Sequence, residues 1–188
     1  MALVAERLMT AAEFALLPDP PQGGKMELVR GRVVVMAPVG PDHGERALDI
    51  GALIRGKTKV SRAGKVRVET GYWIPDEADH VRAPDVSFVR TSRLGNETVL
   101  HGAVTQVPDL AVEVTSPSDR DRDLQEKVDD YLRGGVLRVW VVRPELRTVT
   151  VHRPGGDAHT FTMGDTLTAD DAAIPDDAFT LPVADIFA

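Results

Sequence analysis

The chain has 188 residues, of which 43% are hydrophobic and 27% charged, which fits a single globular domain over residues 1–188. It contains no cysteine, which excludes disulfides, thiolate catalysis and Cys-ligated zinc or iron–sulfur sites. No apolar stretch approaches the roughly 18 residues that a membrane span needs, and residues 1–14 carry acidic groups and lack the apolar core of a secretory signal. We therefore expect a cytoplasmic protein with no membrane partner.

The net charge of −7 is unevenly distributed along the chain. Residues 154–188 hold seven Asp and neither Lys nor Arg, so the first 153 residues carry 22 basic and 22 acidic groups (29 − 7 = 22) and are neutral. Within them, residues 45–67 contain seven Lys or Arg against two acids. Such a run is either a local basic patch for nucleic acid or an ordinary solvated face, and the sequence leaves both interpretations open.

The first third of the chain predicts helices on either side of a hairpin. Residues 10–17 favour a short helix, with Thr10 as its N-cap and a proline directly after it. Residues 26–36 read as two short strands about an Arg-Gly turn. Apolar residues then recur at roughly helical spacing, which predicts a helix over residues 43–57.

After residue 64 the pattern is typical of strands, which we place at 65–74, 85–90 and 108–116. A helix follows over residues 119–135, whose apolar stripe consists of Leu124, Val128, Tyr131 and Leu132. Two further strands are expected at 137–143 and 147–153, and the tail suggests short strands and loops. This order predicts an α/β or α+β fold, in which helices flank a mixed central sheet.

Glu113 is an acidic residue in the middle of an apolar strand, between Val112 and Val114. A buried charge is costly unless it is paired or binds a metal. The neighbouring predicted strand supplies Asp85 at its start, and adjacent strands lie only about 4.8 Å apart. Two such carboxylates repel each other unless a cation lies between them, and Mg²⁺ is typically held by one or two carboxylates and water.

Each of these two strands is preceded by a Pro-Asp pair, Pro84-Asp85 and Pro108-Asp109. Asp109 lies on the same strand face as Glu113 but roughly 13 Å away along the strand. Asp85 is therefore the better partner for Glu113. The alternative is that Asp85 and Asp109 are turn residues that precede their strands, while Glu113 faces solvent or an arginine.

Lys127 borders the apolar stripe of the helix predicted over residues 119–135, whereas Glu126 and Asp130 are expected on its opposite side. A lysine at this edge can lay its stem over apolar surface and direct its ammonium inward. It would then form a structural ion pair with Glu113 or stand near a metal-bound water, or it is simply an edge lysine.

Several stretches together carry a family resemblance: "MELVRGRVVVMAPVGPDHGERALDIGALI", "RAPDVSFV", "PDLAVEVTSPSDRDRDLQEKVDDYLRGGVLRVWVV", "RTVTVHRP" and "GDTLTADDAAIPDDAFTLPVADIF". They resemble the Uma2 family of restriction-endonuclease-like proteins from about Met9 to Phe187. The resemblance implies a PD-(D/E)XK nuclease core, with an added N-terminal hairpin and C-terminal strands, that surrounds a divalent metal with an Asp, a Glu and a Lys.

Carried onto this chain, the resemblance makes Asp85 and Glu113 the metal ligands, together with the Val114 carbonyl. The family motif places its lysine two residues after the Glu, where this chain has Thr115, so Lys127 would be its replacement. Glu27 and His43 also match positions prominent in the family. Without the resemblance, Glu27 can equally be the ion-pair partner of an arginine, and His43 can equally be a helix cap.

The resemblance implies Mg²⁺- or Mn²⁺-dependent hydrolysis of DNA, with a homodimer as the arrangement that cuts both strands symmetrically. The alternative is a catalytically silent module of the same fold that binds nucleic acid or a protein partner. A third interpretation is that an ion pair between Glu113 and Lys127 only stabilises the fold, and that the protein has no functional site there.

Overall fold

The computed structural model describes residues 7–38, 40–76, 78–117 and 119–188. Part of the N-terminal segment discussed above, residues 1–6, lies outside the described residues, as do residues 39, 77 and 118. The helices are α1 (Ala11–Phe14), α2 (Pro41–Thr58), α3 (Thr91–Leu94), α4 (Asp121–Arg133), α5 (Ala169–Ala172) and α6 (Val183–Ile186).

Fourteen strands form three sheets within the described residues. Those of the N-terminal half are β1 (Lys25–Val29), β2 (Arg32–Met36), β3 (Gly64–Val68), β4 (Tyr72–Trp73), β5 (Val81–Arg82), β6 (Val86–Arg90), β7 (Val99–Leu100) and β8 (Ala103–Val104). Those of the C-terminal half are β9 (Leu110–Val114), β10 (Arg138–Arg143), β11 (Thr148–His152), β12 (Ala158–Phe161), β13 (Thr166–Thr168) and β14 (Thr180–Pro182).

The central sheet has the order β12-β11-β10-β9-β6-β3 and is mixed, since β9 and β10 run parallel while its other neighbours are antiparallel. All five residues of β9 are buried, as expected for a strand covered on both faces. α4 follows β9 and forms the crossover to β10, so the end of β9 leads directly into the start of that helix.

Alternating residues of β9 face two different cores. Val112 and Val114 pack on the α2 side with residues such as Ile50 and Trp140. Ala111 belongs to the core on the other face, together with the α4 stripe of Leu124, Val128 and Tyr131. The predicted apolar stripe of α4 is thus confirmed as the surface that covers this sheet.

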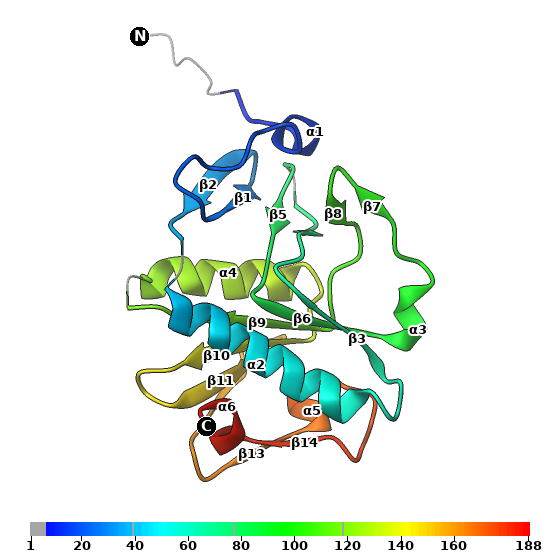
Figure 1. Ribbon diagram of the computed structural model, residues 1–188. Coiled ribbons are helices and arrows are strands. Elements are labelled where there is room, and N and C mark those ends of the chain that lie inside the picture. Colours follow the sequence, from blue (N-terminus) through cyan, green and yellow to red (C-terminus); the bar gives the residue numbers. More distant parts are fainter. Residues whose placement is uncertain (1–6, 39, 77, 118) are drawn as a thin grey trace.

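The N-terminal sheet, with the order β2-β1-β5-β4-β8-β7, lies on the far side of α4 from the central sheet (Figure 1). The predicted hairpin forms its edge, with β1 and β2 paired antiparallel. The turn residue Arg30 has φ 49° and Gly31 has φ 74°, and the glycine suits this left-handed backbone because it lacks a Cβ. α4 is therefore enclosed between two sheets, which the sequence did not predict.

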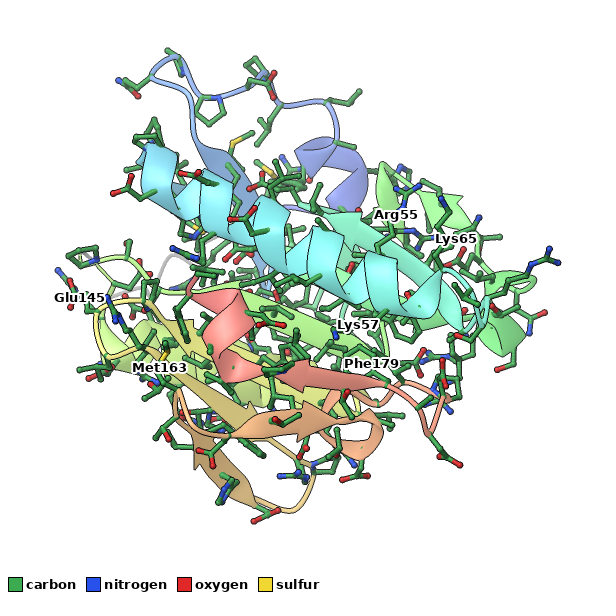
Figure 2. The ribbon with its side chains drawn as sticks, turned by 60° about the horizontal axis from the view of Figure 1, so that its bottom comes forward. Arg55, Lys57, Lys65, Glu145, Met163 and Phe179 are labelled. Atoms are coloured by element: carbon green, nitrogen blue, oxygen red, sulfur yellow. The ribbon has the colours of Figure 1, made fainter. Side chains whose placement is uncertain are left out.

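The tail packs beneath the central sheet, where β13, β14, α5 and α6 cover the α2 side of the core (Figures 1 and 2). Short strands were expected here, but the two short helices were not. In the described part of the chain, no helix is both long and apolar enough to cross a membrane. The predicted fold class, a mixed sheet flanked by helices, is confirmed.

Candidate active site

Asp85 and Glu113 occupy facing positions at the same end of the central sheet. β6 and β9 are antiparallel with Val86 opposite Val112, and one further step in this register brings Asp85 opposite Glu113. Directly opposite residues of an antiparallel pair point to the same face of the sheet. Both residues are buried, at 2% and 4% exposure, and both line one cleft.

Glu113 receives one hydrogen bond on each carboxylate oxygen from α4. The Tyr131 hydroxyl donates to Oε1 at 2.7 Å, and the Lys127 ammonium donates to Oε2 at 3.0 Å. Burial raises the pKa of Glu113 above its usual range, although the charge of Lys127 opposes this effect. The predicted contact between Lys127 and Glu113 is present, and Tyr131 contributes a polar contact as well as its place in the apolar stripe.

Asp85 is held by a different set of donors. Its Oδ1 accepts a hydrogen bond from the Lys25 ammonium at 2.8 Å, and its Oδ2 accepts one from the backbone N–H of Val114 at 2.8 Å. His43 Nε2 lies 3.3 Å from the same Oδ2. Burial alone would raise the pKa of Asp85, but the contacts of His43 and Lys25 outweigh it and hold this pKa well below its usual range.

His43 lies in the first turn of α2 and points into the end of the sheet. Its Nε2 is 2.8 Å from the Val114 carbonyl oxygen as well as close to Asp85. Both neighbours are acceptors, so Nε2 carries the ring proton. The hydrogen bond to Asp85 raises the pKa of His43. His43 therefore ties the Val114 carbonyl and the Asp85 carboxylate together. It does not cap α2, whose N-cap is Gly40 and which has no side-chain cap.

Glu27 is a buried acid on β1, reached from two sides by cations. Arg82 Nη1 donates to its Oε2 at 2.8 Å, and Lys127 Nζ lies 3.7 Å from its Oε1. Burial by itself would raise the pKa of Glu27, but the charges of Lys127 and Arg82 lower it. Lys127 thus stands between Glu27 and Glu113, and these two carboxylates raise its own pKa despite its burial.

Asp130 lies on the side of α4 that the helical wheel predicts, opposite the apolar stripe, but it is buried there. It is 1% exposed and forms ion pairs with Arg30, Arg82 and Arg133. The physical reason is the N-terminal sheet, which covers a second face of the helix that a one-sided wheel treats as solvent. Glu126 does remain exposed there, paired with Arg30.

The cleft at this end of the sheet has a volume of about 750 Å³. Its charged lining includes Lys25, His43, Asp85, Glu113 and Lys127. These five side chains come from β1, α2, the residue before β6, β9 and α4, so four elements and one loop converge on one opening. This size and mixture of polar groups is typical of a site for a substrate.

The oxygen donors in the cleft suit a hard cation, since they are the Asp85 and Glu113 carboxylates and the Val114 carbonyl. Among the described residues, no group of three or more His, Asp or Glu side chains is placed to hold a metal ion. Mg²⁺ needs fewer, because it is commonly held by one or two carboxylates while water fills its remaining positions. The donor set therefore fits a divalent cation that keeps most of its water.

Sequence reasoning missed Lys25 and Arg82, and it assigned Tyr131 only to packing. A signal for Lys25 was available: it precedes Glu27 by two positions, so the two share one face of β1. Thr115 stands where the family motif has lysine, and its hydroxyl donates to the Val142 carbonyl on β10 at 3.3 Å. Thr115 thus contacts the neighbouring strand, while the ammonium groups of the cleft come from β1 and α4.

The chain is similar to proteins of one family along nearly all of its length. The family model of Uma2, described as "putative restriction endonuclease", matches residues 11–184. Among solved structures, a protein from Anabaena variabilis ATCC 29413 described as "a putative nuclease belonging to DUF820" superposes with a TM-score of 0.76 at 22% identity, over 95% of this chain and 97% of that one. A search of the curated proteins gave no match. The match over residues 11–184 shows that the chain belongs to the Uma2 family.

Proposed function

We propose that the protein is a metal-dependent endonuclease that hydrolyses phosphodiester bonds of DNA. The observation that carries this proposal is the pair of facing carboxylates, Asp85 and Glu113, which line an open cleft and each receive a lysine ammonium. Membership of a family described as "putative restriction endonuclease" supports the reaction class. The proposed enzyme is one domain over residues 1–188.

Asp85, Glu113 and the Val114 carbonyl would hold Mg²⁺ or Mn²⁺, which polarises the scissile phosphate and lowers the pKa of a bound water. Lys127 lies 3.0 Å from Glu113 and would orient the attacking water or neutralise charge that develops on the phosphate. Glu27 lies 3.7 Å from the ammonium and holds Lys127 from its other side. His43 would fix Asp85 and the Val114 carbonyl in one arrangement.

DNA as the substrate is further supported by a basic cluster at the far end of α2, which consists of Arg55, Lys57, Lys59, Arg62 and Lys65. Within the described structure these five form no ion pair, whereas Arg46 and Arg67 from the same run are engaged by the Ile186 carbonyl and Glu97. Figure 2 labels Arg55 and Lys57 toward one end of α2, on different sides of the helix.

The spacing between the cleft and the basic cluster suits a bound nucleic acid. Fourteen residues of α2 separate His43 from Lys57, which amounts to about 21 Å along the helix. A DNA strand presents one phosphate every 3.4 Å or so, and this distance therefore covers about six nucleotide steps. The proposed function therefore requires the run of basic residues at 45–67 to be a nucleic-acid patch and not an ordinary solvated face.

The same proposal includes the cytoplasmic location and the homodimer expected from the sequence. A homodimer would present two clefts to the two strands of a duplex. Light scattering of the purified protein tests this, with twice the 20.4 kDa chain mass as the expected result. A monomer that still makes double-strand breaks would contradict the dimer.

Nicking of a supercoiled plasmid in Mg²⁺ or Mn²⁺ tests the proposal, with Glu113→Gln as the inactive variant and Glu145→Gln as its control. Glu145 is an exposed acid at the turn between β10 and β11, outside the cleft (Figure 2). We expect cleavage by the wild type and Glu145→Gln, and a loss of about 10²-fold or more in Glu113→Gln. DNA binding by the wild type without cleavage in either metal would instead favour the catalytically silent module.

A further inference from the structure

Lys25 is a second ammonium in the cleft, and the proposed reaction as described so far gives it no part. It begins β1, and its side chain is only 19% exposed. Its Nζ donates to Asp85 Oδ1 at 2.8 Å and to the Ala83 carbonyl at 3.0 Å. These contacts place a lysine, which is ordinarily a cation at neutral pH, directly against a buried carboxylate.

The two carboxylate oxygens of Asp85 are not equivalent toward an incoming cation. Oδ2 accepts the backbone N–H of Val114 at 2.8 Å and lies 3.3 Å from His43 Nε2, and both of these groups belong to the framework of the site. Oδ1 is held by Lys25, the end of a flexible four-carbon chain. Oδ1 is therefore the oxygen that can be released without moving backbone.

The buried carboxylates at and beside the cleft are already paired with cationic side chains. Asp85 is paired with Lys25, Glu113 with Lys127, and Glu27 with Arg82. A divalent cation that enters this cluster brings two positive charges next to ammonium groups, which is unfavourable unless one of them moves away. Lys127 lies between two carboxylates, whereas Lys25 contacts only Asp85 among the acids in the described structure.

We propose that Lys25 is a built-in counter-ion that occupies Asp85 Oδ1 in the metal-free protein and leaves it when a divalent cation binds. In this role Lys25 keeps a buried carboxylate paired before metal arrives, and it competes with the metal for the same oxygen. Once displaced, its ammonium remains in the cleft, where it contacts a DNA phosphate. This inference rests on the proposed metal dependence of the site.

Titration of Mn²⁺ into the full-length protein tests the competition, because the metal alone is the probe and no DNA is needed. Lys25→Met keeps most of the stem and removes the charge, so we expect it to bind Mn²⁺ at least about ten-fold more tightly than the wild type. Lys25→Arg retains the charge and should bind as the wild type does. Arg122→Met removes an exposed positive charge that lies outside both the cleft and the basic cluster, and it serves as the matched control.

Thermal unfolding of the same proteins gives a second measurement that does not depend on activity. Metal-free Lys25→Met should melt at a lower temperature than the wild type because Asp85 loses its partner, and saturating Mn²⁺ should raise its melting temperature more than that of the wild type. Equal or weaker Mn²⁺ binding by Lys25→Met would overturn the role of Lys25.

The outcomes separate this inference from the proposed function. Unchanged Mn²⁺ affinity in Lys25→Met, combined with metal-dependent plasmid cleavage by the wild type, overturns the role of Lys25 alone. Tighter Mn²⁺ binding in Lys25→Met, combined with a wild type that never cleaves DNA, supports the role of Lys25 and overturns the nuclease. If Mn²⁺ binds to neither protein, both are overturned.

Discussion

Two of the protein's ion-pair clusters have buried carboxylates at their centre, and they differ in the cations that hold those carboxylates. In the open cluster, Asp85 and Glu113 face the cleft and are paired with lysines. In the sealed cluster, Asp130 lies under the N-terminal sheet, where three arginines reach it. An ammonium is a mobile point charge, whereas a guanidinium fixes several hydrogen bonds in a rigid fork.

This contrast separates a candidate site from a structural ion-pair network when both are buried and charged. Burial and a strongly lowered pKa are shared by Asp85 and Asp130, so these properties do not distinguish them. What distinguishes them is access to a cleft and the kind of cation. We therefore assign exchangeable cations to the open cluster and permanent ones to the sealed cluster.

The largest expected effect concerns Lys127 in the open cluster. Lys127→Met keeps the packing of the stem and removes the charge beside Glu113, so cleavage of plasmid DNA should fall by about 10²-fold or more while the protein stays folded. Nicking rates measure the cleavage, and circular dichroism spectra show whether the variant is folded. A variant that cleaves normally, or one that loses roughly 3–5 kcal/mol of unfolding free energy, would make Lys127 a structural residue.

In the sealed cluster the expected effect falls on stability. Asp130→Asn leaves Arg30, Arg82 and Arg133 beside a neutral side chain, which should cost about 3–5 kcal/mol of unfolding free energy in urea denaturation. Asp129→Asn changes an exposed neighbour on the same helix and should stay within about 0.5 kcal/mol of the wild type. If both variants unfold alike, the sealed cluster contributes nothing to the fold.

The basic cluster at the far end of α2 lies outside both carboxylate clusters, and its expected effect is the smallest. Arg55→Ala combined with Lys59→Ala should weaken DNA binding uniformly across sequences. The slope of log affinity against log salt should become shallower by about one for each phosphate that the variant no longer neutralises. Fluorescence anisotropy at several salt concentrations measures both quantities. An unchanged salt slope would mean that the run of positive charge is an ordinary solvated face.

Periodicity and turn residues predicted much of the fold, but not what covers α4. The hairpin, the two long helices and the strands around Glu113 were predicted because each has a local pattern that one packed face explains. Residues 65–74 form two strands, β3 and β4, where one was predicted, because Glu69 between them adopts φ 48° and interrupts the extended backbone. The second sheet is built from strands as short as two residues, which carry too few positions for any periodicity.

The candidate site shows the same division between local and distant information. Glu113 attracts attention because a charge interrupts an apolar run, and Lys127 because it borders an apolar stripe. Arg82 has no such local pattern, and the only local signal for Lys25 is that it shares one face of β1 with Glu27. Their importance comes from contacts across 60 and 55 residues of chain, with Asp85 and Glu27, which only the fold brings together.

Mn²⁺ binding by calorimetry tests the division into open and sealed clusters most directly, with three proteins: the wild type, Asp85→Asn and Asp130→Asn, each at a temperature where it is folded. We expect the wild type and Asp130→Asn to bind Mn²⁺ with equal affinity, because the sealed cluster takes no metal. Asp85→Asn should bind at least about ten-fold more weakly, since a carboxylate ligand is removed. Equal binding by the wild type and Asp85→Asn, or no binding by the wild type, would contradict this division.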